Sequence, residues 1–185
     1  SAGKTIISYD DAGHVLAAAA ELLRHPIIQK NGLLEGAEVE RDLTWTDEAK
    51  SVKCRGRLDA LCAEGRMIVE LKSCRDASPD GFAGTVSDMR YDVQAAFYVD
   101  GARACGIPVE HFYWLAVELE PPYLCAVYAL DPDDMSGARF AYRHDLDLFK
   151  ACCETGRWPG LERSIKLIKL RPWARTERAQ ARGGE

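Results

Sequence analysis

Two apolar-rich runs separated by a short polar turn constrain the fold of this chain more than any other feature. The runs cover residues 56–61 and 67–72, and the five residues between them include a glycine. This pattern predicts two strands joined in a β-hairpin. Glu70 and Lys72 are two residues apart, so their side chains share one face of the strand, which Asp59 can reach from the partner strand. We therefore expect two carboxylates and a lysine to converge at one point of the hairpin.

The surroundings of the two carboxylates indicate a role beyond solvation. Glu70 follows three apolar residues and precedes Leu71, and Asp59 has apolar neighbours on both sides. A buried charge is costly unless it has a partner or a bound cation, and carboxylates bind hard cations such as Mg²⁺. The ammonium group of Lys72 can stabilise charge on a phosphate or orient an attacking water. The alternative is an exposed strand on which charged residues alternate.

The composition is that of a soluble globular protein with one domain. The chain has 185 residues, of which 47% are hydrophobic and 29% are charged, and no apolar run approaches the length of a membrane span. Seven cysteines at scattered positions argue against a disulfide framework, and the start of the chain has no signal-peptide pattern. Both features favour a cytoplasmic protein. The net charge of −5 argues against non-specific coating of nucleic acid, although it allows a local basic channel.

Periodicity and turn signals predict an alternation of helices and strands. The expected strands cover 37–45, 52–61, 66–72, 111–119 and 123–130. The expected helices cover 10–29, from residue 87 or 88 to 105, and 131–155. Asp10 or Asp11 is expected to cap the first helix, and residues 76–84 are expected to form a loop with a turn at Ser78 to Gly81. This order predicts an α/β fold with a mixed central β-sheet flanked by helices.

The second expected helix carries a pair of polar residues that can join the hairpin. Gln94 and Tyr98 are four residues apart and therefore share one helical face. They are either a boundary pair on an amphipathic helix or side chains that approach the carboxylates. In the second case Gln94 can hold a phosphate or the lysine, and Tyr98 can contact the backbone of a nucleic acid.

The end of the chain differs in charge from the rest. We expect a single domain over 1–160, followed by a basic extension over 161–185. This extension is either a solvated tail or a segment that contacts phosphates. Within it, residues 165–170 can form a strand or an extended tail.

Taken together, these motifs resemble a known family of enzymes. They are Gly56-Arg57-Leu58-Asp59, Val69-Glu70-Leu71-Lys72 and Gln94-x-x-x-Tyr98. They look like the PD-(D/E)XK nucleases, specifically the RecB-type branch, and most closely the RecE-like exonucleases of phages and prophages. The likeness extends to residues 120–123, 158–160 and 171–173, so it covers most of the chain.

The resemblance implies a restriction-endonuclease-like core and a role for each motif residue. Asp59 and Glu70 would bind Mg²⁺, for which Mn²⁺ can substitute, together with the backbone carbonyl of Leu71. Lys72 would position or activate the water and stabilise the reacting phosphate. An upstream glutamate often completes such a site, for which Glu40 is the first choice and Glu38 the second. The residues expected to contact DNA are Gln94, Tyr98, Arg57 and Ser73.

The resemblance also implies an activity and partners. The expected enzyme is a Mg²⁺-dependent exodeoxyribonuclease that degrades linear duplex DNA from its 5′ ends during recombination. It would work as a ring-shaped homo-oligomer beside a single-strand annealing protein. Two alternatives remain open: a RecB-type endonuclease or repair nuclease, and a catalytically silent DNA-binding scaffold.

One family feature has no counterpart in this sequence. RecE-like proteins carry a longer N-terminal part, with a Gly-x-x-x-His helix whose histidine joins the metal site. This sequence is expected to begin after that part. His14, which directly follows Gly13, is expected to be a surface or capping residue.

Overall fold

The computed structural model describes residues 8–62, 64, 66–161 and 164–169. Its helices are α1 (Tyr9–Arg24), α2 (Pro26–Lys30), α3 (Pro79–Met89), α4 (Tyr91–Ala104) and α5 (Pro132–Thr155). Its strands are β1 (Glu38–Asp47), β2 (Val52–Cys62), β3 (Met67–Cys74), β4 (His111–Glu118) and β5 (Cys125–Tyr128). Within the described ranges, no helix combines the length and the apolar character needed to cross a membrane.

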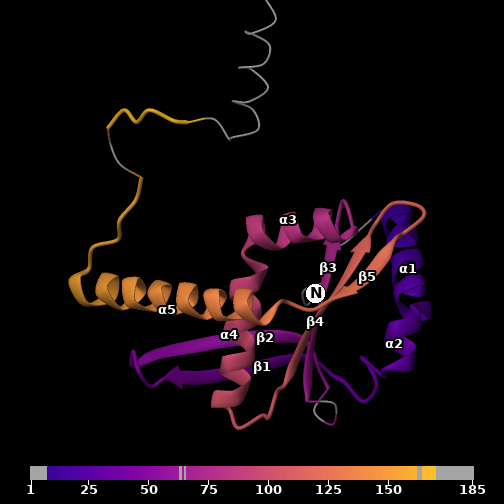
Figure 1. The fold of residues 1–185 in the computed structure, drawn as a ribbon, viewed down its shortest axis with the longest axis horizontal. Helices are drawn as coiled ribbons and strands as arrows, with labels where there is room; N and C mark the ends of the chain where they lie inside the picture. The colour runs from indigo at the N-terminus through magenta and orange to yellow at the C-terminus, as the bar shows by residue number, and fades with distance from the viewer. Residues whose placement is uncertain (1–7, 63, 65, 162–163, 170–185) are drawn as a thin grey trace, which may run out of the picture.

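The five strands form one mixed sheet in the order β1-β2-β3-β4-β5 (Figure 1). Neighbouring strands are antiparallel except for β3 and β4, which run parallel and are joined through α3 and α4. The predicted α/β class with a mixed sheet and flanking helices is confirmed. Both predicted hairpins, β2–β3 and β4–β5, are present.

Helices cover the two faces of the sheet unequally. One hydrophobic core joins α3 and α4 to the sheet, and its fully buried members include Leu58, Ile68, Phe82 and Trp114. A second core joins α1 and α2 to β3, β4 and the end of β2. Helices α1 and α2 therefore lie at the end of the sheet where β2 meets β3, and the turn between β1 and β2 points away from them (Figure 1).

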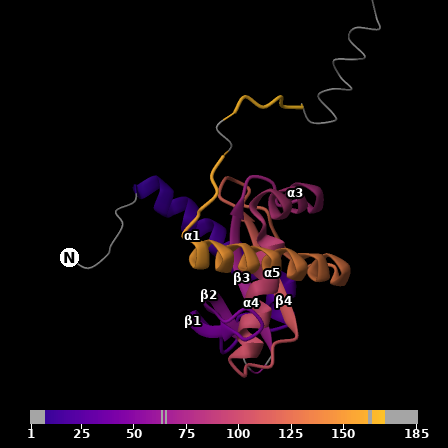
Figure 2. The same cartoon turned by 90° about the vertical axis from the view of Figure 1, so that its left-hand side faces the viewer.

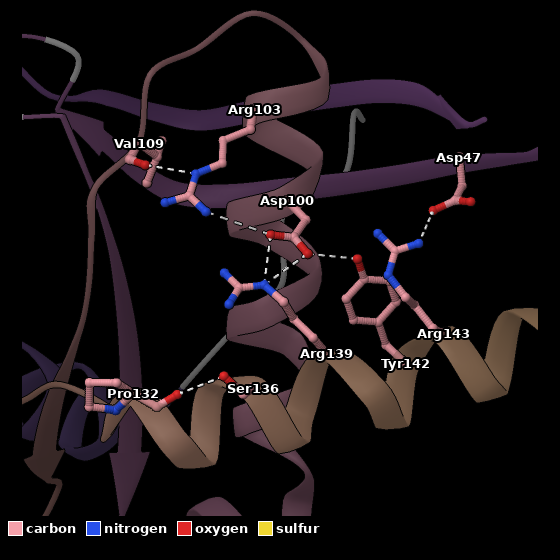
Figure 3. A network of polar contacts seen from close by, with 9 residues as sticks. All are labelled: Asp47, Asp100, Arg103, Val109, Pro132, Ser136, Arg139, Tyr142 and Arg143. Atoms are coloured by element: carbon pink, nitrogen blue, oxygen red, sulfur yellow. Dashed lines mark hydrogen bonds and ion pairs between the residues drawn. The ribbon is translucent and has the colours of Figure 1, made fainter. Parts of the chain in front are cut away.

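Helix α5 packs outside α4 and is joined to it by a polar contact. In Figure 2 it lies across α4. The carboxylate of Asp100 on α4 accepts hydrogen bonds from Arg139 Nε at 3.0 and 3.1 Å and from Tyr142 Oη at 2.7 Å (Figure 3). Burial first, and then the bond to Asp100, raise the pKa of the Tyr142 hydroxyl. Arg143 continues the contact to Asp47 at the end of β1, at 3.4 Å.

The first helix differs from its prediction at both ends. Ser8 caps it, since its hydroxyl accepts a hydrogen bond from the Asp11 N–H at 3.0 Å, so the predicted caps Asp10 and Asp11 lie inside the first turn. The helix also stops at His25, because the residue before a proline disfavours helical geometry. Pro26 then begins α2, and His25 Nδ1 accepts a bond from the Ile27 N–H.

The predicted loop over 76–84 is wrong. Ser78 caps α3 by accepting from the Gly81 N–H at 3.3 Å, and Pro79 occupies the first turn. Serine followed by proline is as typical of a helix start as of a turn. The predicted start of the next helix at residue 87 or 88 is also wrong, because Arg90 adopts a left-handed conformation (φ 55°) that separates α3 from α4.

The last helix matches its prediction, and the segment after it does so in part. Asp131 caps α5 through the Asp133 N–H, and Gly156 ends it with φ 66°. Residues 164–169 form neither helix nor strand. Most of the predicted basic extension over 161–185, including Leu170, lies outside the described residues.

Candidate active site at the fork between β2 and β3

Strands β2 and β3 pair only near their turn and then separate. Their register joins Ala60 to Val69, Leu61 to Ile68 and Cys62 to Met67. Beyond these pairs β2 continues beside β1, while β3 continues beside β4. Asp59 and Glu70 are the first residues on each strand after the separation. The fork therefore brings the two predicted carboxylates together.

A distortion of β2 at this point turns Asp59 toward β3. Leu58 belongs to the core below α4 and Ala60 to the core below α1, although residues two apart in a regular strand share a face. Opposite Asp59 on β1, Glu40 has a positive φ of 53°. The Asp59 carboxylate accepts a hydrogen bond from the Leu71 N–H at 2.9 Å, which replaces a missing strand partner.

Glu70 is the only charged or polar side chain that is buried among the described residues, with 3% of its surface exposed. Its Oε1 accepts hydrogen bonds from Lys72 Nζ at 3.1 Å and Gln94 Nε2 at 3.0 Å, and its Oε2 lies 3.4 Å from the Asp59 N–H. Burial raises the pKa of the Glu70 carboxyl, and the Asp59 charge raises it further, against the opposing effect of Lys72. Burial of the carboxylate is thus the main cause of the raised pKa.

Lys72 is held in place from two sides. Its ammonium lies 4.4 Å from the ring centroid of Tyr91 and 3.1 Å from Glu70 Oε1, and 14% of its side chain is exposed. Cation–π and charge contacts of this kind fix a flexible side chain in one position. The prediction that Glu70 and Lys72 share a face is confirmed.

Gln94 reaches the site, whereas Tyr98 packs beside it. Gln94 Nε2 donates to Glu70, while its Oε1 is buried without a hydrogen-bond partner in the described part of the chain. The Tyr98 ring lies against Gly56, where an added Cβ would be 2.9 Å from Cε1. Gly56 is thus needed for a close approach of β2 to α4. The expected contacts of Gln94 and Tyr98 with DNA stay predictions.

The upstream glutamates contact arginines rather than the carboxylate pair. Glu40 lies 3.3 Å from Arg57, and Glu38 lies 2.9 Å from Arg41. Arg57 also binds Asp42, which lies directly opposite it in the β1–β2 register and was not singled out from the sequence. The hydrogen bond from Arg57 lowers the pKa of Asp42 to about 2. A metal-binding role for Glu40 or Glu38 stays a prediction.

Two further residues lie apart from the fork. Ser73 is exposed near the end of β3, so its contact with DNA stays a prediction. His14 is only partly exposed, with Nδ1 3.0 Å from the Tyr123 hydroxyl, so its prediction as a surface residue holds in part. The physical reason is that the loop between β4 and β5 folds against α1, a long-range contact that no local pattern in the sequence signals.

The donor atoms at the fork fit a hard divalent cation. Asp59 and Glu70 offer carboxylate oxygens and Leu71 a backbone carbonyl, which are the oxygen ligands that Mg²⁺ binds. Burial raises the pKa of Glu70 because it disfavours the ionised carboxylate. A bound cation would stabilise this ionised form. Among residues 8–62, 64, 66–161 and 164–169, no three His, Cys, Asp or Glu side chains group in a way that could hold a metal.

Comparison with solved structures shows the same fold elsewhere. A crystal structure described as "Putative exonuclease" from Eubacterium rectale has a TM-score of 0.59 and 17% sequence identity, with 83% of this chain and 63% of that chain covered. The present chain thus spans less than two thirds of that protein. A second structure, SSO0001, has a TM-score of 0.40 and 19% identity over 75% of this chain and 58% of that chain, too low to bear on the fold.

Comparison with protein families is more specific. No curated protein matches the chain. A family model described as a PDDEXK-like domain of unknown function (DUF3799) matches residues 7–170, which include every residue of the fork. The chain therefore belongs to this PDDEXK-like family.

Proposed function

We propose that this protein is a metal-dependent deoxyribonuclease that hydrolyses phosphodiester bonds at the fork between β2 and β3. The observation that carries the proposal is the buried Glu70 carboxylate, which contacts Lys72, Gln94 and the backbone of Asp59 at one point of the sheet. A buried carboxylate with a raised pKa beside a second carboxylate and an oriented lysine is typical of a functional site.

Asp59 and Glu70, with the Leu71 carbonyl, would hold the Mg²⁺ ion. When bound, the ion would supply positive charge to the phosphate and lower the pKa of a coordinated water. Both carboxylates are already fixed by backbone N–H groups, so little rearrangement is needed to bind a cation. Mn²⁺ prefers the same oxygen donors and would substitute.

Lys72 would act on the substrate itself. Its ammonium is a permanent donor beside the carboxylates, and it can stabilise the negative charge that develops on the phosphate oxygens as water attacks in line. Tyr91 and Glu70 hold this ammonium in place before the substrate arrives, which lowers the cost of reorganisation during the reaction. Gln94 keeps Glu70 in position, and its free Oε1 can accept a hydrogen bond from a bound water.

The finer proposal is a 5′-to-3′ exonuclease acting on linear duplex DNA in recombination. It is supported by the resemblance of the Gln94-x-x-x-Tyr98 helix to RecE-like enzymes. The Eubacterium rectale protein that shares the fold bears the name "Putative exonuclease" as well. A ring-shaped homo-oligomer and a single-strand annealing partner belong to the same proposal.

The test compares linear and closed circular duplex DNA, labelled at either the 5′ or the 3′ ends, with Mg²⁺ or with a chelator. We expect Mg²⁺-dependent release of nucleotides from linear DNA, early loss of the 5′ label, and intact circles. Cleavage of the circles would show an endonuclease and overturn the finer proposal. An absence of cleavage with both Mg²⁺ and Mn²⁺ would favour a silent DNA-binding domain.

A further inference from the structure

Positively charged side chains form a row on strand β2 that leads to the fork. Lys53, Arg55 and Arg57 alternate along the strand, and all three are exposed. Residues two apart in a strand share a face and lie about 6.6 Å apart. Asp59 is the next residue in this alternation, so the row ends at a candidate metal ligand. We call the surface formed by Lys53, Arg55 and Arg57 the basic face.

The basic face is the side of the β1–β2 hairpin that faces away from α4. The residues that alternate with it along β2 are buried, and they face the helix. Leu58 belongs to the core below α4, and Gly56 lies against the ring of Tyr98. Because successive side chains of a strand point to opposite faces, the basic face is open to a ligand without movement of α4.

Strand β1 adds hydroxyl groups beside the cations. In the antiparallel register Thr46 lies opposite Lys53, and Thr44 lies opposite Arg55. Both threonines are exposed, and directly opposite residues have Cβ atoms about 5 Å apart on the same face. Lysine, arginine and threonine side chains all bind phosphate oxygens in protein–DNA complexes. Each of these two cross-strand pairs can therefore offer a cation and a hydroxyl group to one phosphate.

Carboxylates neutralise the row near the fork but not at its far end. Arg57 binds Asp42 at 2.9 Å and Glu40 at 3.3 Å. Arg55 shares Asp42 at 3.3 Å, and 69% of its side chain is exposed. Lys53 has no ion pair within the part of the chain that the structure describes. Three cations thus face two carboxylates here, although the whole chain has a net charge of −5, and local positive charge of this kind attracts a polyanion.

We propose that the basic face binds the phosphate backbone of the DNA strand that is cleaved at the fork. The two cation–threonine pairs contact phosphates beyond the one that is cleaved, and Arg57 lies between these pairs and the fork. Binding is independent of base sequence, because phosphate contacts carry no sequence information directly. This inference rests on the proposed function, since it assigns a path to the substrate of the same site.

The first test measures DNA binding without hydrolysis. The full chain is titrated into a short, fluorescently labelled linear duplex in the presence of a chelator, at several salt concentrations, and binding is followed by anisotropy. Lys53→Gln combined with Arg55→Gln should weaken binding about tenfold or more at low salt. It should also lower the slope of log Kd against log salt concentration by about 2, since each lost phosphate contact lowers it by about 1.

A matched control removes the same charge elsewhere. Arg24→Gln combined with Lys30→Gln changes one arginine that has an ion pair and one exposed lysine, at the ends of α1 and α2. This control should keep the affinity and the salt slope of the wild type. Circular dichroism checks that each variant is folded.

Cleavage in Mg²⁺ separates this inference from the proposed function. The variant with both Lys53 and Arg55 replaced should raise KM about tenfold and change kcat by less than about twofold, as when binding away from the reacting atoms is lost. A wild type that binds DNA with the expected salt slope but does not cleave it would contradict the proposed function and support the basic face. Equal affinity and slope in the wild type and this variant, an equal loss in the control, a fall in kcat at unchanged KM, or no binding by the wild type at low salt would each overturn the inference.

Discussion

At the scale of single residues, Glu70 makes the stability of the protein depend on pH. Burial and Asp59 raise its pKa above the ordinary value of 4.5. A carboxyl whose folded pKa is raised costs stability when it ionises. This cost is absent below the ordinary pKa, grows as the pH rises through the folded pKa, and is fully present above it.

Glu70→Gln should therefore raise the melting temperature of the metal-free protein near neutral pH. The gain should vanish below about pH 4, where the wild-type carboxyl is protonated in both states. Mg²⁺ at about a hundred times its Kd should stabilise the wild type by about 2.7 kcal/mol and the variant far less. Glu35→Gln, at an exposed position, is the control. A melting temperature unchanged at neutral pH, or an equal response to Mg²⁺, would contradict this account of Glu70.

At the scale of elements, the β1–β2 hairpin approaches α4 through a glycine. A Cβ added at Gly101 would lie 2.6 Å from two ring atoms of Trp45, whereas one at Gly137 on α5 would have nothing within 4 Å. Gly101→Ala should destabilise the fold by about 1–3 kcal/mol because the ring must move. Gly137→Ala should stabilise it by about 0.5–1 kcal/mol, since alanine favours a helix. Urea unfolding measures the free energy of unfolding of both variants. Changes of the same sign in the two variants would contradict the close packing of Gly101 against Trp45.

The contact between α4 and α5 gives a second prediction at this scale. Asp100→Ala removes the acceptor of Tyr142 and Arg139, so it should cost about 1–3 kcal/mol, while Tyr142→Phe should cost about 0.5–1.5 kcal/mol. The double variant should then cost less than the sum of the two, because both changes break the same hydrogen bond. If the losses in the free energy of unfolding, measured with urea, add up in the double variant, the hydrogen bond between Tyr142 and Asp100 in Figure 3 contributes little to stability.

At the scale of the whole molecule, local patterns predict the elements better than their arrangement. The strands of the β2–β3 hairpin follow from two apolar runs around a polar turn, and α5 follows from Asp131-Pro132 and Gly156. The parallel pairing of β3 with β4 does not follow, because it depends on how α3 and α4 cross the sheet. The sequence also does not predict the split between α3 and α4 at Arg90. No pattern in the sequence signals a positive φ at an arginine.

At the candidate site, too, local spacing predicts some of the contacts and not others. Asp59, Glu70, Lys72 and Gln94 were predictable because their spacing on strands and a helix brings them together. The contacts of Glu40 with Arg57 and of His14 with Tyr123 depend on strand register and loop packing between distant segments. Sequence spacing carries no information about such contacts. The fork itself is also a property of the whole sheet, because β2 must leave β3 to stay with β1.

The most direct test of the central claim is cleavage of linear duplex DNA by the wild type, Lys72→Met and Asp59→Asn in Mg²⁺. Methionine keeps an apolar stem beside Tyr91, and circular dichroism checks that each variant is folded. We expect Mg²⁺-dependent cleavage by the wild type and a loss of about a hundredfold or more in both variants, as when a group that stabilises transition-state charge is removed. Cleavage by folded Lys72→Met at the wild-type rate, or none by the wild type in Mg²⁺ or Mn²⁺, would contradict the assignment of the fork as the active site.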